Sequence, residues 1–270
     1  MNRFSFSLCF IVVVLLAAGP WLAREQPVLG WLLSLAFLMA FMLISGYSIT
    51  GKWLGALIDD RNVISLARFQ MAVWTGLLLS AFLAAALLNL SLGQNNATEI
   101  HIAKELWALM GISSTSLVAS PLILSTKENK DPSAVDLELL NRESGTAMGN
   151  RGQVVVNREI SQAHWSDMFT GEEVGNARHL DLSRIQMFFF TVVTAVTYGG
   201  AIAHYFWSQG NAGIHALPSL DASMIALIGI SHTGYLAAKA VPRGQRADLA
   251  ANARAVEPEL AADLEPPPMG

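Results

Sequence analysis

The side chains in this 270-residue chain that could do chemistry lie inside apolar segments. His232 follows Ser231 in one segment, and Ser113 and Ser114 occupy the matching place in another. Histidine titrates near neutral pH, and an ionisable group within a membrane is a functional candidate by default. A neutral histidine bonded to a serine would satisfy a packed core equally well, and serine hydroxyls can bond back to their own helix. A polar midplane site and a packed core therefore both remain open.

No sequence motif fixes a reaction. The chain has no phosphate-binding loop, dinucleotide fingerprint or zinc-ligand pattern, and His164, Asp167 and His179 lack the spacing of a metal site. The single cysteine, Cys9, excludes an intramolecular disulfide. No stretch is basic enough to suggest nucleic-acid binding. We therefore predict a protein that is not an enzyme and that uses no cofactor, metal or nucleic acid.

The elements that hold the polar side chains are long apolar segments. Hydrophobic residues make up 53% of the chain and charged residues only 14%, whereas soluble domains carry about 25% charged residues. About 20 apolar residues are enough for a helix to cross the bilayer core. We predict an all-α membrane helix bundle with about six transmembrane helices at 6–22, 28–49, 71–92, 106–124, 185–207 and 223–241. The first segment could instead be a cleaved signal peptide, although its length favours an uncleaved helix.

The basic residues predict how the chain is oriented. Of the seventeen Lys and Arg residues, all but Arg24 and Lys104 fall on one side of the predicted bundle. Cytoplasmic loops of membrane proteins carry an excess of Lys and Arg. We therefore predict a protein of the inner (plasma) membrane with both termini in the cytoplasm. The lipid bilayer is then its first partner.

A two-helix unit occurs twice in the sequence. The residues at 65–75 match those at 181–191, and the residues at 109–119 match those at 227–237. A unit with an even number of helices keeps its orientation when duplicated, so we predict a tandem parallel repeat. These paired motifs resemble motifs of bacterial membrane proteins, and the resemblance implies no particular activity. The predicted divisions are an N-terminal hairpin at 1–64 (a candidate third copy), hairpins at 65–125 and 181–242, a cytoplasmic loop at 126–180, and a disordered tail at 243–270.

Each copy of the unit begins with a helix cap followed by an arginine. A cation in the first turn of a helix opposes the helix dipole, so a nearby anion is expected. That anion could come from the acidic pairs at 59–60 and 172–173 or from lipid phosphates, or the arginines could simply snorkel to the interface. The interface residues predicted in this way are Ser65, Arg68, Gln70, Asp181, Arg184 and Gln186.

The second helix of each copy carries small residues four positions apart. Ridges of small residues let membrane helices approach closely. We predict that the two return helices pack on each other, or on the first helices of their units, through these ridges. The ridge residues are Gly111, Thr115, Ala119, Gly229, Thr233 and Ala237.

The order of serine and histidine also resembles that of rhomboid intramembrane proteases. Those proteins have six helices, a Gly-x-Ser on the fourth and a histidine on the sixth, which Gly111-Ile-Ser113 and His232 match. The resemblance implies a serine protease with Ser113 as nucleophile. The chain departs from that pattern, because Ser114 stands where a glycine is expected and the second helix has no His or Asn for the oxyanion hole.

We predict a non-catalytic membrane scaffold or accessory subunit that assembles through the ridges, with itself or with another membrane protein, and binds partners with the loop at 126–180. The alternative is a channel or transporter for a small solute or ion, with Ser113, Ser231 and His232 along its path. A water-accessible cavity between the polar faces of the return helices would favour the conduit. A dry, tightly packed interface would favour the scaffold.

Overall fold

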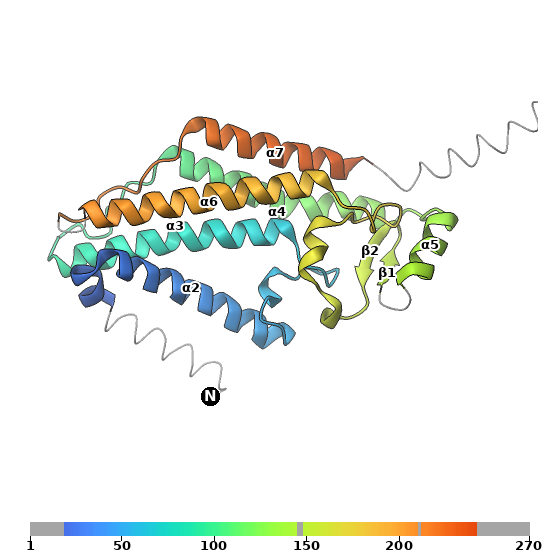
Figure 1. The fold of residues 1–270 in the computed structure, drawn as a ribbon, viewed down its shortest axis with the longest axis horizontal. Coiled ribbons are helices and arrows are strands. Elements are labelled where there is room, and N and C mark those ends of the chain that lie inside the picture. The colour runs from blue at the N-terminus through green and yellow to red at the C-terminus, as the bar shows by residue number, and fades with distance from the viewer. Residues whose placement is uncertain (1–18, 145–147, 210–211, 242–270) are drawn as a thin grey trace, which may run out of the picture.

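The structure is a computed structural model that describes residues 19–144, 148–209 and 212–241. Its long helices lie side by side, and a β-hairpin gathers at one end of the bundle, which we call the β-hairpin end (Figure 1). The predicted tail and most of the first predicted span lie outside the described residues. The elements are α2 (Pro27–Thr50), η1 (Gly55–Leu57), α3 (Leu66–Ser91), α4 (Lys104–Glu128), α5 (Ala134–Ser144), β1 (Met148–Arg151), β2 (Val154–Asn157), η2 (Ile160–Gln162), η3 (Trp165–Phe169), α6 (Leu182–Gln209) and α7 (Ala222–Ala240).

Four of the described helices, α2, α3, α4 and α6, are long and apolar enough to cross a membrane. This agrees with the predicted mostly helical membrane protein. Helix α7 has 19 residues and packs along α4 and α6, but it is not one of those four. The described residues therefore support four spans, and the predicted count of about six stays a prediction.

Helix α3 forms the centre of the bundle because its small residues allow neighbours to approach. It packs against α2, α4 and α6, and Ala81, Ala84 and Ala85 are at most 1% exposed. The indole Nε1 of Trp31 on α2 donates to Ser80 Oγ on α3 at 3.0 Å. Most residues of α2, by contrast, are at least partly exposed. An apolar exposed face is what a lipid-facing helix requires.

The two return helices, α4 and α7, do pack on each other, but not through most of the predicted ridge residues. Gly111, Thr115, Thr233 and Ala237 are exposed, and a side chain added at Gly111 would meet no atom within 4 Å. The prediction that the ridges form the contacts within the chain is therefore wrong for these four residues, whereas a Cβ added at Gly229 would lie 3.6 Å from Ile112 Cδ1 on α4. The α4–α7 contact also uses neighbouring faces of the two helices, which carry buried polar side chains such as Ser116 and His232.

The segment predicted as a loop at 126–180 folds into a small unit. Strands β1 and β2 pair antiparallel, and Leu140, Val155, Val174 and Ala177 form a small core beneath them. The unit is attached directly to α4, because Gln153 N donates to Lys127 O at 3.1 Å. A segment of this length buries little apolar surface by itself, and its attachment to the helix ends explains why it can fold.

The opposite end of the bundle is closed by a buried amide. Asn89, at the end of α3, donates through Nδ2 to the carbonyl oxygens of Ala97 and Ile214 at 3.2 and 2.8 Å. Its Oδ1 accepts from Ile214 N at 2.8 Å. One side chain thus joins the connection between α3 and α4 to the connection between α6 and α7.

Candidate functional site

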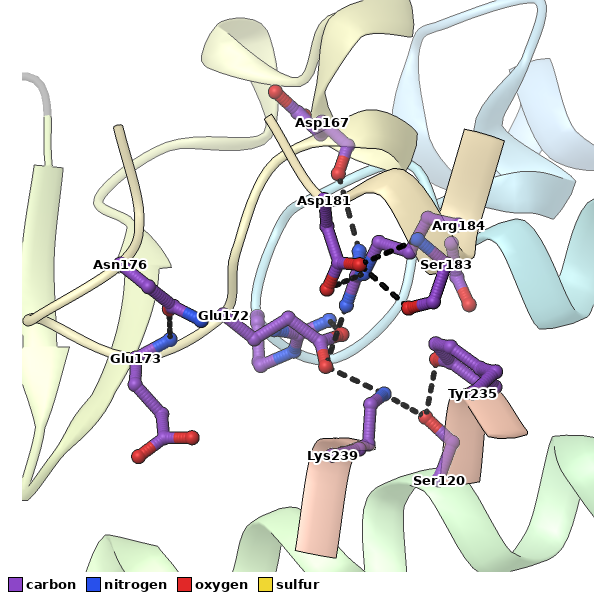
Figure 2. A network of polar contacts seen from close by, with 12 residues as sticks. Ser120, Asp167, Glu172, Glu173, Asn176, Asp181, Ser183, Arg184, Tyr235 and Lys239 are labelled. Carbon is purple, nitrogen blue, oxygen red and sulfur yellow. Dashed lines mark hydrogen bonds and ion pairs between the residues drawn. The ribbon is translucent and has the colours of Figure 1, made fainter. Parts of the chain in front are cut away.

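A carboxylate at the β-hairpin end, Glu172, binds three cations from different parts of the chain (Figure 2). Arg61 and Arg184 approach it through Nη2 at 2.7 and 2.6 Å, and Lys239 through Nζ at 2.5 Å. Arg61 precedes α3, Arg184 lies in the first turn of α6, and Lys239 lies in the last turn of α7. The side chain of Glu172 is 9% exposed, and those of its three partners are 4–5% exposed.

Further charges surround these four and balance them. Asp59 pairs with Arg61 at 2.8 Å, and Asp181 lies 3.7 Å from Arg184. A second buried pair, Lys127 with Glu173 at 2.7 Å, lies beside them, and Lys127 Nζ also donates to Lys239 O at 2.5 Å. We call this set the Glu172 cluster. It contains four acidic and four basic side chains: Asp59, Glu172, Glu173, Asp181, Arg61, Lys127, Arg184 and Lys239.

Glu172 and the arginines bound to it hold each other in the charged form. Burial by itself would raise the pKa of Glu172, but the charges of Arg184, Arg61 and Lys239 outweigh it and hold that pKa well below its ordinary value. Burial likewise tends to lower the pKa of Arg61, but Glu172 and Asp59 raise it above its ordinary value. A carboxylate held in this way gives up its charge only in strong acid. Glu172 can therefore hold three segments together, but it is a poor proton donor or acceptor near pH 7.

The structure separates the two arginines that the sequence treats as equivalent. Arg184 binds Glu172, which is the arginine–carboxylate clasp among the alternatives that the sequence left open. In the first unit, Asp59 binds Arg61 instead, and among the described residues Arg68 makes no ion pair. Both predicted caps are present: Ser65 Oγ accepts from Arg68 N at 3.5 Å, and Asp181 Oδ1 accepts from Ser183 N at 3.0 Å.

The two glutamines of the motif differ in the same way. Gln70 is fully buried, and its Nε2 donates to Thr191 Oγ1 on α6 at 2.6 Å. Gln186, its counterpart, is exposed. The matched sequence motifs therefore occupy unlike surroundings, and only one glutamine joins the two units.

A file of polar side chains runs between α4 and α7 towards the Glu172 cluster. His232 Nδ1 lies 2.6 Å from Ser116 Oγ, and the Tyr235 hydroxyl lies 3.3 Å from Ser120 Oγ. Lys239 Nζ donates to Ser120 Oγ and also binds Glu172. We call Ser116, His232, Ser120, Tyr235 and Lys239 the polar file. It connects the interior of the α4–α7 contact to the charges at the β-hairpin end.

The predicted midplane residues are only partly brought together. Ser113, Ser231 and His232 are buried. Each of these three buried side chains has an atom with no hydrogen-bond partner among the described residues: Ser113 Oγ, Ser231 Oγ and His232 Nε2. Ser114 is exposed on α4, so the prediction that it belongs to the polar midplane site is wrong. Sequence reasoning missed Ser116.

A spacing signal could have found the missed serine. Residues three and four positions apart share one face of a helix. Ser113, Ser116 and Ser120 have this spacing on α4, as do His232 and Tyr235 on α7. All five are buried, which marks the faces of α4 and α7 that meet.

The serine–histidine pair differs from the arrangement that the rhomboid resemblance implies. The serine bound to His232 is Ser116 and not Ser113, and it is bound through Nδ1. Serine proteases take up the nucleophile's proton through Nε2. Ser116 is 1% exposed, and the two large cavities described, of about 640 and 690 Å³, are lined by other residues. In this geometry the pair makes a buried hydrogen bond.

No protein-family model matches this chain, and no curated protein and no solved structure is detectably similar to it. The function must therefore be argued from the geometry of the chain itself.

Proposed function

We propose that this protein is a non-catalytic membrane scaffold or accessory subunit that associates with further copies of itself through the outer faces of α4 and α7. The observation that carries the proposal is which side chains of these two helices face each other and which face outward. Their polar side chains face each other and are buried, as Ser116 and His232 show. Their small residues, including Gly111 and Thr233, face outward.

The outward ridges have the properties of a helix-packing surface. Gly111 presents no side chain, and Thr233 satisfies its hydroxyl within its own helix by donating to Gly229 O at 2.8 Å. In lipid, association depends on close backbone approach rather than on the hydrophobic effect, so small residues favour it. A second copy packed on these ridges would bury a surface that one chain leaves uncovered.

In this proposal the β-hairpin end lies in the cytoplasm of a cell bounded by a plasma (inner) membrane, together with both termini. The excess of Lys and Arg at that end supports this orientation. The Glu172 cluster ties Arg61, Arg184 and Lys239 to one carboxylate. The small folded unit at the β-hairpin end is thereby held in a fixed position relative to the helices, as a platform for a binding partner requires.

The test is self-association in a bilayer. Fluorescently labelled protein is placed in liposomes over a range of protein-to-lipid ratios, and photobleaching steps count the copies in each particle. We expect the wild type to form oligomers, and Gly111→Leu to need at least about tenfold higher density, because overpacking costs about 1–3 kcal/mol. Leu32→Phe, at a site that is 44% exposed on α2 and therefore away from both ridges, is the control. A wild type that stays monomeric at every density would contradict the proposal.

The polar file favours a second candidate function, a conduit for a small solute or ion. Ser113 Oγ, Ser231 Oγ and His232 Nε2 are the buried atoms that water or an ion could satisfy. Flux into proteoliposomes should then change between about pH 5 and 8, and His232→Gln should flatten that response. If there is no flux, or if neither pH nor His232→Gln alters it, the conduit is refuted and the scaffold is the remaining proposal.

A further inference from the structure

An amphipathic cavity of about 640 Å³ lies on the face of the bundle formed by α2, α3 and α4. Most of its wall is apolar, with Met42, Met71, Leu79 and Leu117 among the lining residues. Its volume is within the range of about 300–1,000 Å³ that is typical of small-molecule sites. Because the three helices are long and apolar enough to span a membrane, this wall is suited to a hydrocarbon chain.

The polar lining residues of the same cavity come mainly from the β-hairpin end of these helices. They belong to the segment between η1 and α3, to the first turn of α3 and to the last turn of α4. One end of the cavity is therefore charged and the rest is apolar. The charged end includes Asp59, Asp60, Arg61, Ser65, Arg68 and Glu128.

Arg68 is a basic residue at this end whose counter-ion is not supplied by the described residues. Arg68 is partly buried and has no ion pair within the described part of the chain. Arg61 is already bound by Asp59 and Glu172, and Arg184, which occupies the matching place in the second unit, is bound by Glu172. A guanidinium binds phosphate oxygens well, because its planar donors match their geometry.

The carboxylates at the same end of the cavity restrict which phosphate-containing headgroup can bind there. Asp60 and Glu128 line the same cavity end, and among the described residues they pair only with Arg151, at 3.3 and 3.9 Å, whose side chain is 48% exposed. A headgroup with a net negative charge would be repelled by these carboxylates. A headgroup with both a phosphate and an ammonium would be attracted to both sets of charges, and a trimethylated ammonium could not donate hydrogen bonds to them.

We propose that this cavity binds a phosphatidylethanolamine molecule from the leaflet at the β-hairpin end. Its phosphate lies against Arg68, its ammonium lies near Asp60 and Glu128, and an acyl chain follows the apolar wall towards Leu79. None of the ridge residues of α4 and α7 lines this cavity, so the proposal does not depend on self-association through the ridges.

The test compares headgroups on otherwise identical lipids. The full-length protein in mild detergent is mixed with equal amounts of dioleoyl phosphatidylethanolamine, phosphatidylcholine and phosphatidylglycerol, and native mass spectrometry measures the bound species. We expect one ethanolamine lipid per chain to be retained about tenfold more than either of the others, as the loss of one charge-assisted bond predicts. Equal retention of all three lipids, or preference for phosphatidylglycerol, would overturn the proposal.

Two variants locate the site, with a third as control. Arg68→Gln should lower retention of all three lipids, because each carries the phosphate that Arg68 binds, and Leu117→Trp should do the same by occupying the apolar wall. Lys130→Gln removes an exposed cation that does not line the cavity, and it should behave as the wild type. Unchanged retention in folded Arg68→Gln would refute the assignment. If a variant fails to fold, the headgroup comparison on the wild type still decides.

Discussion

Replacing Glu172 with glutamine removes the negative charge that three buried cations share. Arg61, Arg184 and Lys239 would then face one another without their common counter-ion. Asp59 still binds Arg61 and Asp181 remains near Arg184, so Lys239 loses the most. A glutamine of nearly the same size keeps the packing, which means that the measured effect reports the charge.

The expected cost follows from the burial of the cluster. Breaking a buried ion pair by removing one partner typically costs about 3–5 kcal/mol, because a charge is left uncompensated. The partner side chains are 4–5% exposed, so solvent cannot replace the lost carboxylate. In a domain of this size, that cost corresponds to a fall in Tm of roughly 10 °C.

Thermal unfolding in detergent measures this change, with exposed Glu138→Gln as the matched control. The control should unfold within about 0.5 kcal/mol of the wild type. Equal Tm values for Glu172→Gln and the wild type at pH 7 would refute the role of Glu172 as the common counter-ion. A double-mutant cycle with Lys239→Met should show a coupling energy of about 0.5–3 kcal/mol.

The pH dependence of this difference has a definite sign. The pKa of Glu172 is lower in the folded protein than in the unfolded chain. Its contribution is therefore fully present above the unfolded value of about 4.3, and it is lost as the pH falls through the folded value. The Tm difference between the wild type and Glu172→Gln should be constant from about pH 5 to 8 and shrink in stronger acid. A difference that already shrinks between pH 7 and 5 would contradict the lowered pKa.

Three further predictions concern orientation and packing. Cysteines introduced at Asn141 and Asn95 in a Cys9→Ser background should label from opposite sides of the membrane, Asn141 from the cytoplasm; external labelling at Asn141 would reverse the proposed orientation. Ser116→Ala leaves His232 Nδ1 without its partner and should cost about 1–3 kcal/mol in thermal unfolding, whereas exposed Ser114→Ala should cost almost nothing. Gly46→Ala should lower the free energy of unfolding by about 1–3 kcal/mol, because the added Cβ would lie 2.5 Å from Ala56 N. Gly111→Ala is the control, because a Cβ added there would meet no atom within 4 Å. Equal losses of stability in the two variants would rule out this account of the packing.

The apolar segments could be predicted from the sequence because the length and lack of charge of a span are local properties. Helices α2, α4 and α6 contain the predicted segments 28–49, 106–124 and 185–207, and α3 contains the segment 71–92 except for its last residue. The clasp on Arg184 was one of the readings that the sequence allowed, since Glu172 lies shortly before it in the chain. The participation of Arg61 and Lys239 could not be foreseen, because it depends on how two distant segments meet.

The ridges show what a pattern within one helix leaves undetermined. Small residues four apart mark a face of a helix but do not say what lies against that face. In α4 the face that meets α7 carries Ser113, Ser116 and Ser120, and the ridge at Gly111 points outward. The matching motifs of Arg68 and Arg184 likewise gave no sign that only one arginine has a carboxylate partner.

The most direct test of the scaffold account is whether water reaches the polar residues between α4 and α7. Ser113→Cys and Ser231→Cys are made in the Cys9→Ser background, reconstituted in liposomes, and exposed to a small, charged, membrane-impermeant thiol reagent on either side. The positions carrying these cysteines are 0% and 7% exposed, so the account predicts no labelling of either variant under conditions that fully label Asn141→Cys or Asn95→Cys. Labelling of Ser113→Cys or Ser231→Cys at a rate comparable to those controls would contradict the scaffold and establish a water-filled path.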